Sequence, residues 1–173
     1  MELKDFISGT LAGVSRPLNI ALEGITDEQL TYRPNDHSNS IAWLVWHLTR
    51  VQDRIVSGLA GKQQAWVADG WHAKFGRPAE EGDAGMGHGP DEVASIKPQS
   101  AQLLLDHYNG ILKHSEAYVS GLGPSDFDRV VDPSNPEVTV GRRLQVCIMD
   151  NVQHAGQAAY LRGLIEGRKV WPS

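Results

Sequence analysis

Several residue types are scarce in this chain of 173 residues, and each scarcity excludes a class of protein. The one cysteine, Cys147, rules out an intrachain disulfide framework and a multi-cysteine zinc site. Its neighbours Val146 and Ile148 are apolar, which favours a packed thiol over a catalytic one. The formal net charge is −5, so the chain lacks the basic excess that is typical of nucleic-acid binding.

Long apolar runs are absent as well. No stretch approaches the roughly 20 apolar residues that a membrane-spanning helix needs. The first six residues carry acidic side chains where a secretory signal would carry positive charge. We therefore expect a cytoplasmic protein without a membrane partner. The chain is 40% hydrophobic and 21% charged, which is typical of a globular protein, and its length fits one domain over residues 1–173.

Helical periodicity is present in four long segments. Apolar residues recur at intervals of three and four over about 3–24, 41–59, 98–121 and 140–167. Pro17 falls inside the first segment and predicts a kink or break near residues 14–16. Residues 26–29 have the form of a capping box, and Asn39 or Ser40 can cap the second long segment. The fold class predicted is all-α: an up-down four-helix bundle with one extended crossover.

The crossover is a glycine-rich connector between the second and third long segments. Residues 66–90 contain eight glycines or prolines, which predicts a long stretch without regular structure. Such stretches are commonly either mobile or functional. The connector also carries rings that suit a lid over a cavity in the bundle: Trp66, Trp71, His72, Phe75 and His88. Histidines without any assigned task are the alternative for such a loop.

Three polar residues form a candidate metal site. Asp150 and His154 lie four residues apart in the fourth segment, so a carboxylate and an imidazole share one helical face. His47 flanks the apolar stripe of the second segment and supplies a third group. A carboxylate with two imidazoles is a common ligand set for a divalent metal, here expected to be zinc or nickel, and it leaves positions for water or substrate. The alternative is structural, with Asp150 simply paired to the histidines.

Two stretches of sequence carry a family resemblance. They are NSIAWLVWHL at residues 39–48 and DNVQHAGQAAYLRG at residues 150–163, with a supporting match at residues 26–34. The chain resembles the DinB-like superfamily over most of its length. The resemblance implies a four-helix bundle in which His47, Asp150 and His154 bind a divalent metal. In that superfamily the ligand at the position of Asp150 is His in many members and Glu in others, so this chain offers a shorter carboxylate.

The resemblance also implies thiol chemistry. Several relatives are transferases or isomerases that use a low-molecular-weight thiol such as mycothiol or bacillithiol, and some resemble the mycothiol-dependent maleylpyruvate isomerase. A divalent metal suits this chemistry because it lowers the pKa of a bound thiol. We therefore expect a thiol-dependent S-transferase or isomerase that acts on a small electrophile, with the thiol as cosubstrate. The alternative is a non-catalytic DinB-like protein that serves a stress response or binds a small molecule.

Three further residues are candidates for substrate binding. Arg50 and Arg162 can hold the carboxylates or hydroxyls of a thiol ligand, although solvent-exposed salt bridging is the commoner role for arginines on helices. Trp43 can stack on a substrate, with packing as the alternative.

The remaining signals concern other histidines and the oligomeric state. His107 and His114 share a face, and they line the cavity or hold a surface or tyrosine-packed position. Trp171 is an apolar residue that a monomer would have to cover, which predicts a homodimer.

Overall fold

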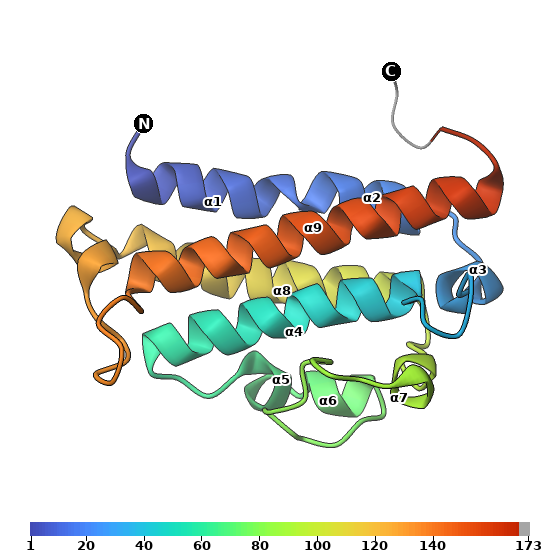
Figure 1. The fold of residues 1–173 in the computed structure, drawn as a ribbon, viewed down its shortest axis with the longest axis horizontal. Helices are drawn as coiled ribbons and strands as arrows, with labels where there is room; N and C mark the ends of the chain where they lie inside the picture. Colours follow the sequence, from blue (N-terminus) through green and yellow to red (C-terminus); the bar gives the residue numbers. More distant parts are fainter. Residues whose placement is uncertain (170–173) are drawn as a thin grey trace.

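The computed structural model describes residues 1–169, so Trp171 lies outside the described residues. The secondary structure is helical (Figure 1). In chain order it consists of α1 (Leu3–Gly13), α2 (Ser15–Leu22), α3 (Asp27–Thr31), α4 (Ile41–Ala60), α5 (Ala65–Ala68), α6 (Trp71–Lys74), α7 (Pro90–Ala94), α8 (Ala101–Ser120), the 3-10 helix η1 (Pro124–Asp128) and α9 (Val140–Glu166). Within residues 1–169 the only β-type pairing is one isolated bridge. The predicted all-α fold is confirmed.

Four long helical segments make up the bundle: α1 followed by α2, and then α4, α8 and α9. Helix α4 packs against both α8 and α9, while α1 lies on α8 and α2 lies on α9. Figure 1 shows that α4 and α8 run in the same direction, because the chain between them returns along the outside of α4 through α5, α6 and α7. Helices α4 and α9 are in contact and run in opposite directions. The seam between these two helices holds the candidate metal site.

Local signals explain where the helices begin and end. Ser40 caps α4 by accepting a hydrogen bond from the backbone amide of Trp43 at 3.1 Å, and α4 ends at Gly61 in the left-handed conformation. The predicted break in the first segment is confirmed, since α1 ends at Gly13 and α2 begins at Ser15. Pro17 lies in the first turn of α2, where its missing amide has no partner within the helix.

The connector differs from the unstructured stretch that we predicted. It contains α5 and α6, and the rings of Trp66 and Trp71 are 1% and 8% exposed. Both rings belong to the main hydrophobic core cluster, and Phe75 packs against that cluster. The prediction of a structureless segment is wrong, because buried aromatic side chains stabilise short helices that glycine content alone disfavours.

A buried polar chain links three of the long helices. Asn151 on α9 donates to the side-chain oxygen of Gln52 on α4. Gln52 in turn donates to the hydroxyl of Ser115 on α8 at 2.8 Å, and that hydroxyl donates to the carbonyl of Ile111. A buried amide needs its partners, so these bonds restrict how α9 can rotate or slide against α4. They position residue 150, next to Asn151, against α4.

Among the helices of the described chain, none combines the length and the apolar composition needed to cross a membrane.

Candidate metal centre

Three ligand-type side chains meet between α4 and α9. His47 from α4 and the pair Asp150 and His154 from α9 each place one ligand atom so that the three atoms lie within 4.8 Å of one another. The Nε2 atom of His47 is 3.6 Å from Oδ1 of Asp150, and the Nε2 atom of His154 is 3.5 Å from the same oxygen. The structure therefore brings together the three residues that the sequence selected.

Hydrogen bonds at the opposite ring nitrogens fix how the two imidazoles face Asp150. Nδ1 of His47 contacts the backbone carbonyl of Ala84, and Nδ1 of His154 lies 2.7 Å from the amide oxygen of Gln157. Carbonyl oxygens only accept, so each Nδ1 carries the proton. In the neutral ring, Nε2 then bears a lone pair. Both lone pairs point at the carboxylate of Asp150.

Asp150 has fewer hydrogen-bond partners than a carboxylate at this depth requires. Its Oδ2 atom is buried and has no hydrogen-bond partner within residues 1–169. Its Oδ1 atom meets only the two imidazoles, at distances longer than a normal hydrogen bond. Facing acceptors repel one another unless a cation or protons lie among them.

The donor set and its two spacings to Asp150 fit a divalent cation. Nitrogen and oxygen ligands bind zinc at about 2.0–2.1 Å in a tetrahedron, which separates neighbouring ligand atoms by about 3.4 Å. The two measured spacings to Asp150 are 3.5 and 3.6 Å. The shorter side chain of an aspartate therefore reaches the position that this geometry needs.

Protons compete with a cation for the same place. Burial would raise the pKa of Asp150, but the His154 and His47 imidazoles, which donate to the carboxylate when Nε2 is protonated, outweigh burial and lower this pKa to about 2. Burial would likewise lower the pKa of His154, yet its bonds to Asp150 and Gln157 raise it above the ordinary value. The carboxylate is thus ionised at neutral pH, and it attracts either a proton onto His154 or a metal ion.

Comparison with known proteins decides the family. A family model of the DinB superfamily matches residues 12–158. The chain belongs to the DinB superfamily. Among solved structures, the crystal structure of a conserved protein from Enterococcus faecalis matches with a TM-score of 0.89 and 29% identity, over 97% of this chain and 99% of that one. No curated protein matches the chain significantly. The predicted resemblance is confirmed, and the matched structure's description names no activity.

Trp43 forms a wall of the candidate metal centre in this DinB-superfamily protein. Its ring stacks on the His47 imidazole, with centroids 4.5 Å apart and planes 8° apart, and its edge meets His154 at 6.2 Å. Its indole nitrogen donates to Nδ1 of His88 at 3.2 Å. The side chain is only 6% exposed. These contacts describe the packing role that the sequence left open, and they restrict the motion of both imidazoles.

Arg50 is fully buried, so the expectation of a solvent-exposed arginine is wrong. Its guanidinium donates to Asp53 at 3.2 Å and stacks over the Trp66 ring at 4.5 Å. The other donors reach the backbone carbonyls of Glu80, Glu81 and Asp83. The physical reason is that carbonyl oxygens of the connector satisfy the donors that water would otherwise satisfy. Arg50 therefore holds the connector on α4.

Arg162 is 3% exposed, which corrects the same expectation for this second arginine. It donates to the carbonyl of Glu23 at 3.0 Å and pairs with Glu166 at 2.8 Å. It therefore ties α9 to the end of α2.

Two other predictions concerned His107 and Cys147. His107 is completely buried among Trp66, Trp71 and Phe75, so a surface position for it is wrong. Cys147 is fully buried, and burial, followed by the charge of Asp150, raises its pKa to about 12. The prediction of a packed thiol is confirmed, because a thiol with this pKa holds its proton at neutral pH.

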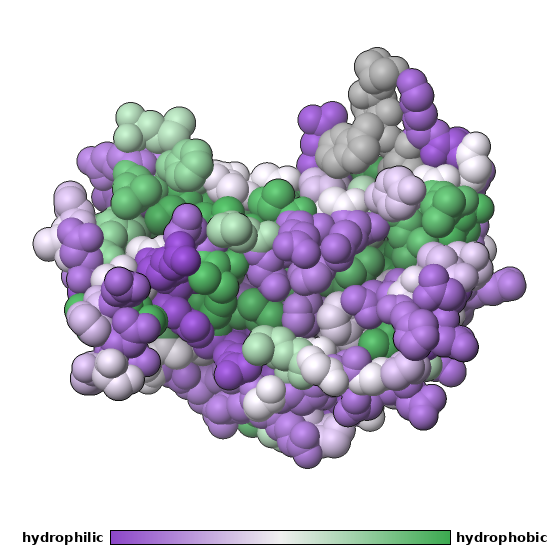
Figure 2. Space-filling model, viewed as in Figure 1, coloured by the Kyte–Doolittle hydropathy of each residue, from purple (hydrophilic) through white to green (hydrophobic). Residues whose placement is uncertain are grey.

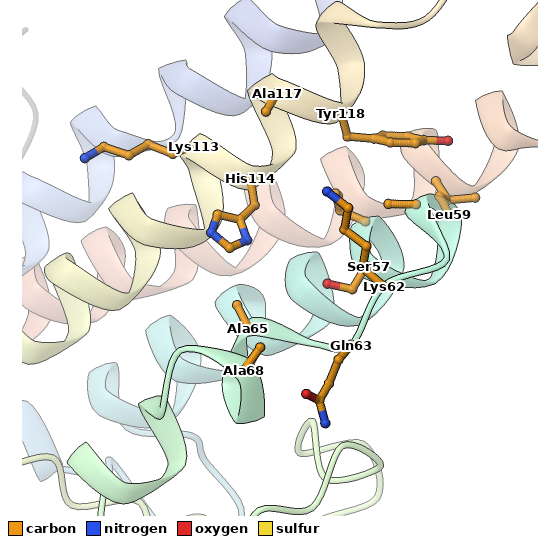
Figure 3. Close-up of a pocket in the computed structure, with 12 residues that line it drawn as sticks. Ser57, Leu59, Lys62, Gln63, Ala65, Ala68, Lys113, His114, Ala117 and Tyr118 are labelled. Carbon is orange, nitrogen blue, oxygen red and sulfur yellow. The ribbon is translucent and has the colours of Figure 1, made fainter.

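A separate hollow lies at the far end of α4 (Figure 3). It measures about 640 Å³ and lies between the end of α4, α5 and α8. Figure 3 shows that His114 points into the space between α8 and α5, whereas Lys113 points away from the other labelled side chains. None of the three candidate ligands lines this hollow. It is therefore distinct from the candidate metal centre.

Proposed function

We propose that this DinB-superfamily protein binds a divalent metal, zinc or nickel, through Nε2 of His47, Nε2 of His154 and the carboxylate of Asp150. One observation carries the proposal: two imidazoles with protons on Nδ1 turn their lone pairs toward a carboxylate whose buried second oxygen has no described partner. The family resemblance assigns a metal to the same three positions.

Elemental analysis of the purified protein tests this proposal. The protein is stripped with a chelator, reloaded separately with Zn²⁺ and Ni²⁺, and titrated against a competing chromophoric chelator. We expect about one metal ion per chain in the wild type and none in His154→Ala. His114→Ala is the matched control, because His114 is half exposed and pairs with Asp69. A wild-type chain that takes up neither ion contradicts the proposal.

We further infer that the metal centre serves a thiol-dependent S-transferase or isomerase. A divalent cation held here supplies Lewis acidity, which lowers the pKa of a thiol that binds to it. The carboxylate of Asp150 neutralises one of its two charges, so the centre keeps a net positive charge that favours an anionic cosubstrate. The side chains of Asp150 and His154 are 21% and 14% exposed, which supports access for small molecules. Trp43 shields the ring of His47 from water.

Product analysis tests the catalytic role. The metal-loaded protein is incubated with a small electrophile and, in turn, mycothiol, bacillithiol, glutathione and cysteine, and mass spectrometry detects the S-conjugate or isomer. We expect turnover with at least one thiol and none with Asp150→Asn. The absence of turnover with every thiol favours the alternative, a non-catalytic binding protein. One observation supports that alternative: the pKa of His154 is raised, so a proton on its ring can pair with Oδ1 of Asp150 without a metal.

A homodimer is also part of the proposal. Exposed apolar side chains occur on the outer faces of α1 and α9, and Figure 2 shows hydrophobic residues over these helices. They include Leu3, Phe6, Val146, Met149 and Val152. A second copy of the chain would cover such a surface. Sedimentation velocity at micromolar concentration tests this, with Met149→Glu expected to shift the protein to monomer. A wild-type monomer contradicts it.

A further inference from the structure

Residues 83–88 of the connector form a turn that lies directly on His47. The carbonyl of Ala84 accepts the hydrogen bond from Nδ1 of His47, 37 positions away in the chain. Gly85 follows, with φ +86°. A Cβ atom at this position would lie 2.9 Å from the Trp43 ring, 3.0 Å from Nδ1 of His47 and 3.0 Å from the Trp46 ring. A side chain at residue 85 is therefore incompatible with this close approach.

The turn is held in place by its own contacts. Asp83 accepts hydrogen bonds from Arg77 at 3.0 Å, from Nε2 of His88 at 3.0 Å and from the backbone amide of Gly85 at 3.2 Å. His88 then presents an unprotonated Nδ1, which accepts from the indole of Trp43 at 3.2 Å. The Trp43 side chain, which packs against the imidazoles of the candidate metal centre, is thus hydrogen-bonded to the same turn.

The turn is also attached to α4 through Arg50. Arg50 lies about one helical turn after His47 on α4. Its Nε atom donates to the carbonyl of Asp83 at 3.2 Å. The Trp46 ring stacks on His88 with centroids 5.8 Å apart. The acceptor for His47 therefore has a defined position before any ligand arrives.

We propose that Ala84 and Gly85 are positioning residues for the metal ligand His47. The Ala84 carbonyl keeps the ring in the form that is protonated on Nδ1, and the missing side chain of Gly85 lets that carbonyl reach the ring. A ligating histidine whose second nitrogen donates to a fixed acceptor has its orientation and tautomer set in advance, and loss of such a partner typically costs 10–100-fold in metal affinity. The inference rests on the proposed metal site.

A pair of glycine variants tests the inference. Gly85→Ala and Gly87→Ala both place alanine at a positive φ, +86° and +81°, so both carry the same backbone strain. Only the Cβ at 85 meets neighbours, because nothing lies within 4 Å of a Cβ at 87. We expect Gly85→Ala to lower Zn²⁺ affinity about 10–100-fold and to shift the visible absorption bands of the Co²⁺-loaded protein. We expect Gly87→Ala to keep the wild-type affinity and Co²⁺ spectrum.

Three outcomes separate this inference from the proposed function. Equal affinity and equal Co²⁺ spectra for Gly85→Ala and the wild type overturn the positioning role and leave the metal site standing. Failure of the wild type to bind either Zn²⁺ or Ni²⁺ contradicts the proposed function itself. If Gly85→Ala does not fold, the zinc-loaded wild type decides by ¹⁵N–¹H NMR of its histidines. A hydrogen-bonded proton on Nδ1 of His47 supports the inference, and a proton on Nε2 overturns it.

Discussion

Two charged clusters lie one helical turn apart on α4, and they are completed in different ways. In the first, Asp53 is 2% exposed, and both of its oxygens accept hydrogen bonds, from Arg50, from the Ser57 hydroxyl and from the backbone amides of residues 65 and 66. In the second, Asp150 meets two imidazoles at long distances and keeps one buried oxygen without a described partner.

The difference separates a structural cluster from a candidate binding site. A buried ion pair stabilises a fold only where additional hydrogen bonds satisfy its remaining donors and acceptors. The Arg50 and Asp53 cluster meets this condition with protein atoms alone. The Asp150 cluster does not, although the same helix contributes to it. We infer that the first cluster holds the connector in place and that the second is completed by a ligand.

The largest expected effect follows from breaking the structural cluster. Arg50→Met leaves the Asp53 carboxylate buried without its cation, which costs about 3–5 kcal/mol. For a chain of this size we expect the melting temperature to fall by on the order of 10 °C. Urea and thermal denaturation of the metal-free protein measure both quantities. Arg54→Met is the control, because Arg54 is exposed on the same helix. A loss below about 1 kcal/mol would contradict the structural role.

The opposite pattern is expected for the second cluster. Asp150→Asn removes the anionic ligand but keeps the side-chain shape, so metal affinity should fall by more than about 100-fold. The free energy of unfolding of the metal-free protein should fall by about 1–2 kcal/mol, less than for Arg50→Met, because solvent screens the pairing of the partly exposed Asp150 with the imidazoles. Chelator competition and urea denaturation provide the two measurements, with the exposed Asp106→Asn as control. If Asp150→Asn destabilises the metal-free fold as strongly as Arg50→Met, the distinction between the clusters fails.

Much of the fold was predictable because its signals are local. The apolar stripes repeat with the helical period, and Ser40 and Gly61 mark the ends of α4 by their own chemistry. The spacing of Asp150 and His154 likewise needs nothing beyond one helical turn. Their meeting with His47 was different, since it requires α4 and α9 to be neighbours. The family resemblance supplied that step.

The supports of the site could not be predicted in this way. The acceptor for His47 is the backbone carbonyl of Ala84. Every residue has such a carbonyl, so the residue type at position 84 does not indicate this role. Gly85 stands among several glycines of the connector, and only its contacts distinguish it from Gly87. Arg50 looked like a surface residue because its partners are carbonyls about 30 positions away. Such long-range contacts depend on tertiary packing, which local patterns do not encode.

The second cluster should also respond to pH in two opposite directions. In the metal-free protein the raised pKa of His154 adds stability that is fully present below about 6.5 and is lost as pH rises through the folded value. The lowered pKa of Asp150 adds stability that is present above about 3.9 and is lost as pH falls toward about 2. Metal binding needs an unprotonated Nε2, so metal affinity should instead rise with pH.

Melting temperatures and Zn²⁺ affinities between pH 5.5 and 8 test these opposite slopes. We expect the contribution of His154 to metal-free stability to decline over this range while affinity increases. His154→Gln is the control, because it cannot be protonated and should remove that contribution. An affinity that does not change with pH would argue against imidazole ligands.

The smallest effect is expected at His107, and it sharpens the comparison between the clusters. Both ring nitrogens of His107 are buried without a hydrogen-bond partner in the described part of the chain, yet its surroundings are Trp66, Trp71 and Phe75 rather than ligand-type groups. An unsatisfied polar group without ligand-type neighbours does not make a site. His107→Phe should therefore change the free energy of unfolding by less than about 1 kcal/mol at pH 7.5, since an apolar ring of similar shape replaces it.

The free energy of unfolding of His107→Phe should also depend on pH differently from that of the wild type. Burial, followed by the charges of Arg50 and Lys74, holds the pKa of His107 well below its ordinary value. The unfolded chain binds this proton below about pH 6.5 and the folded chain does not, so wild-type stability falls as pH drops through that range. In His107→Phe this loss should disappear, and the variant should gain stability relative to the wild type between pH 7.5 and pH 5. Urea denaturation of both metal-free proteins measures the gain, with the half-exposed His114→Phe as control. An unchanged pH profile would mean that His107 is protonated inside the fold, and that its nitrogens have partners after all.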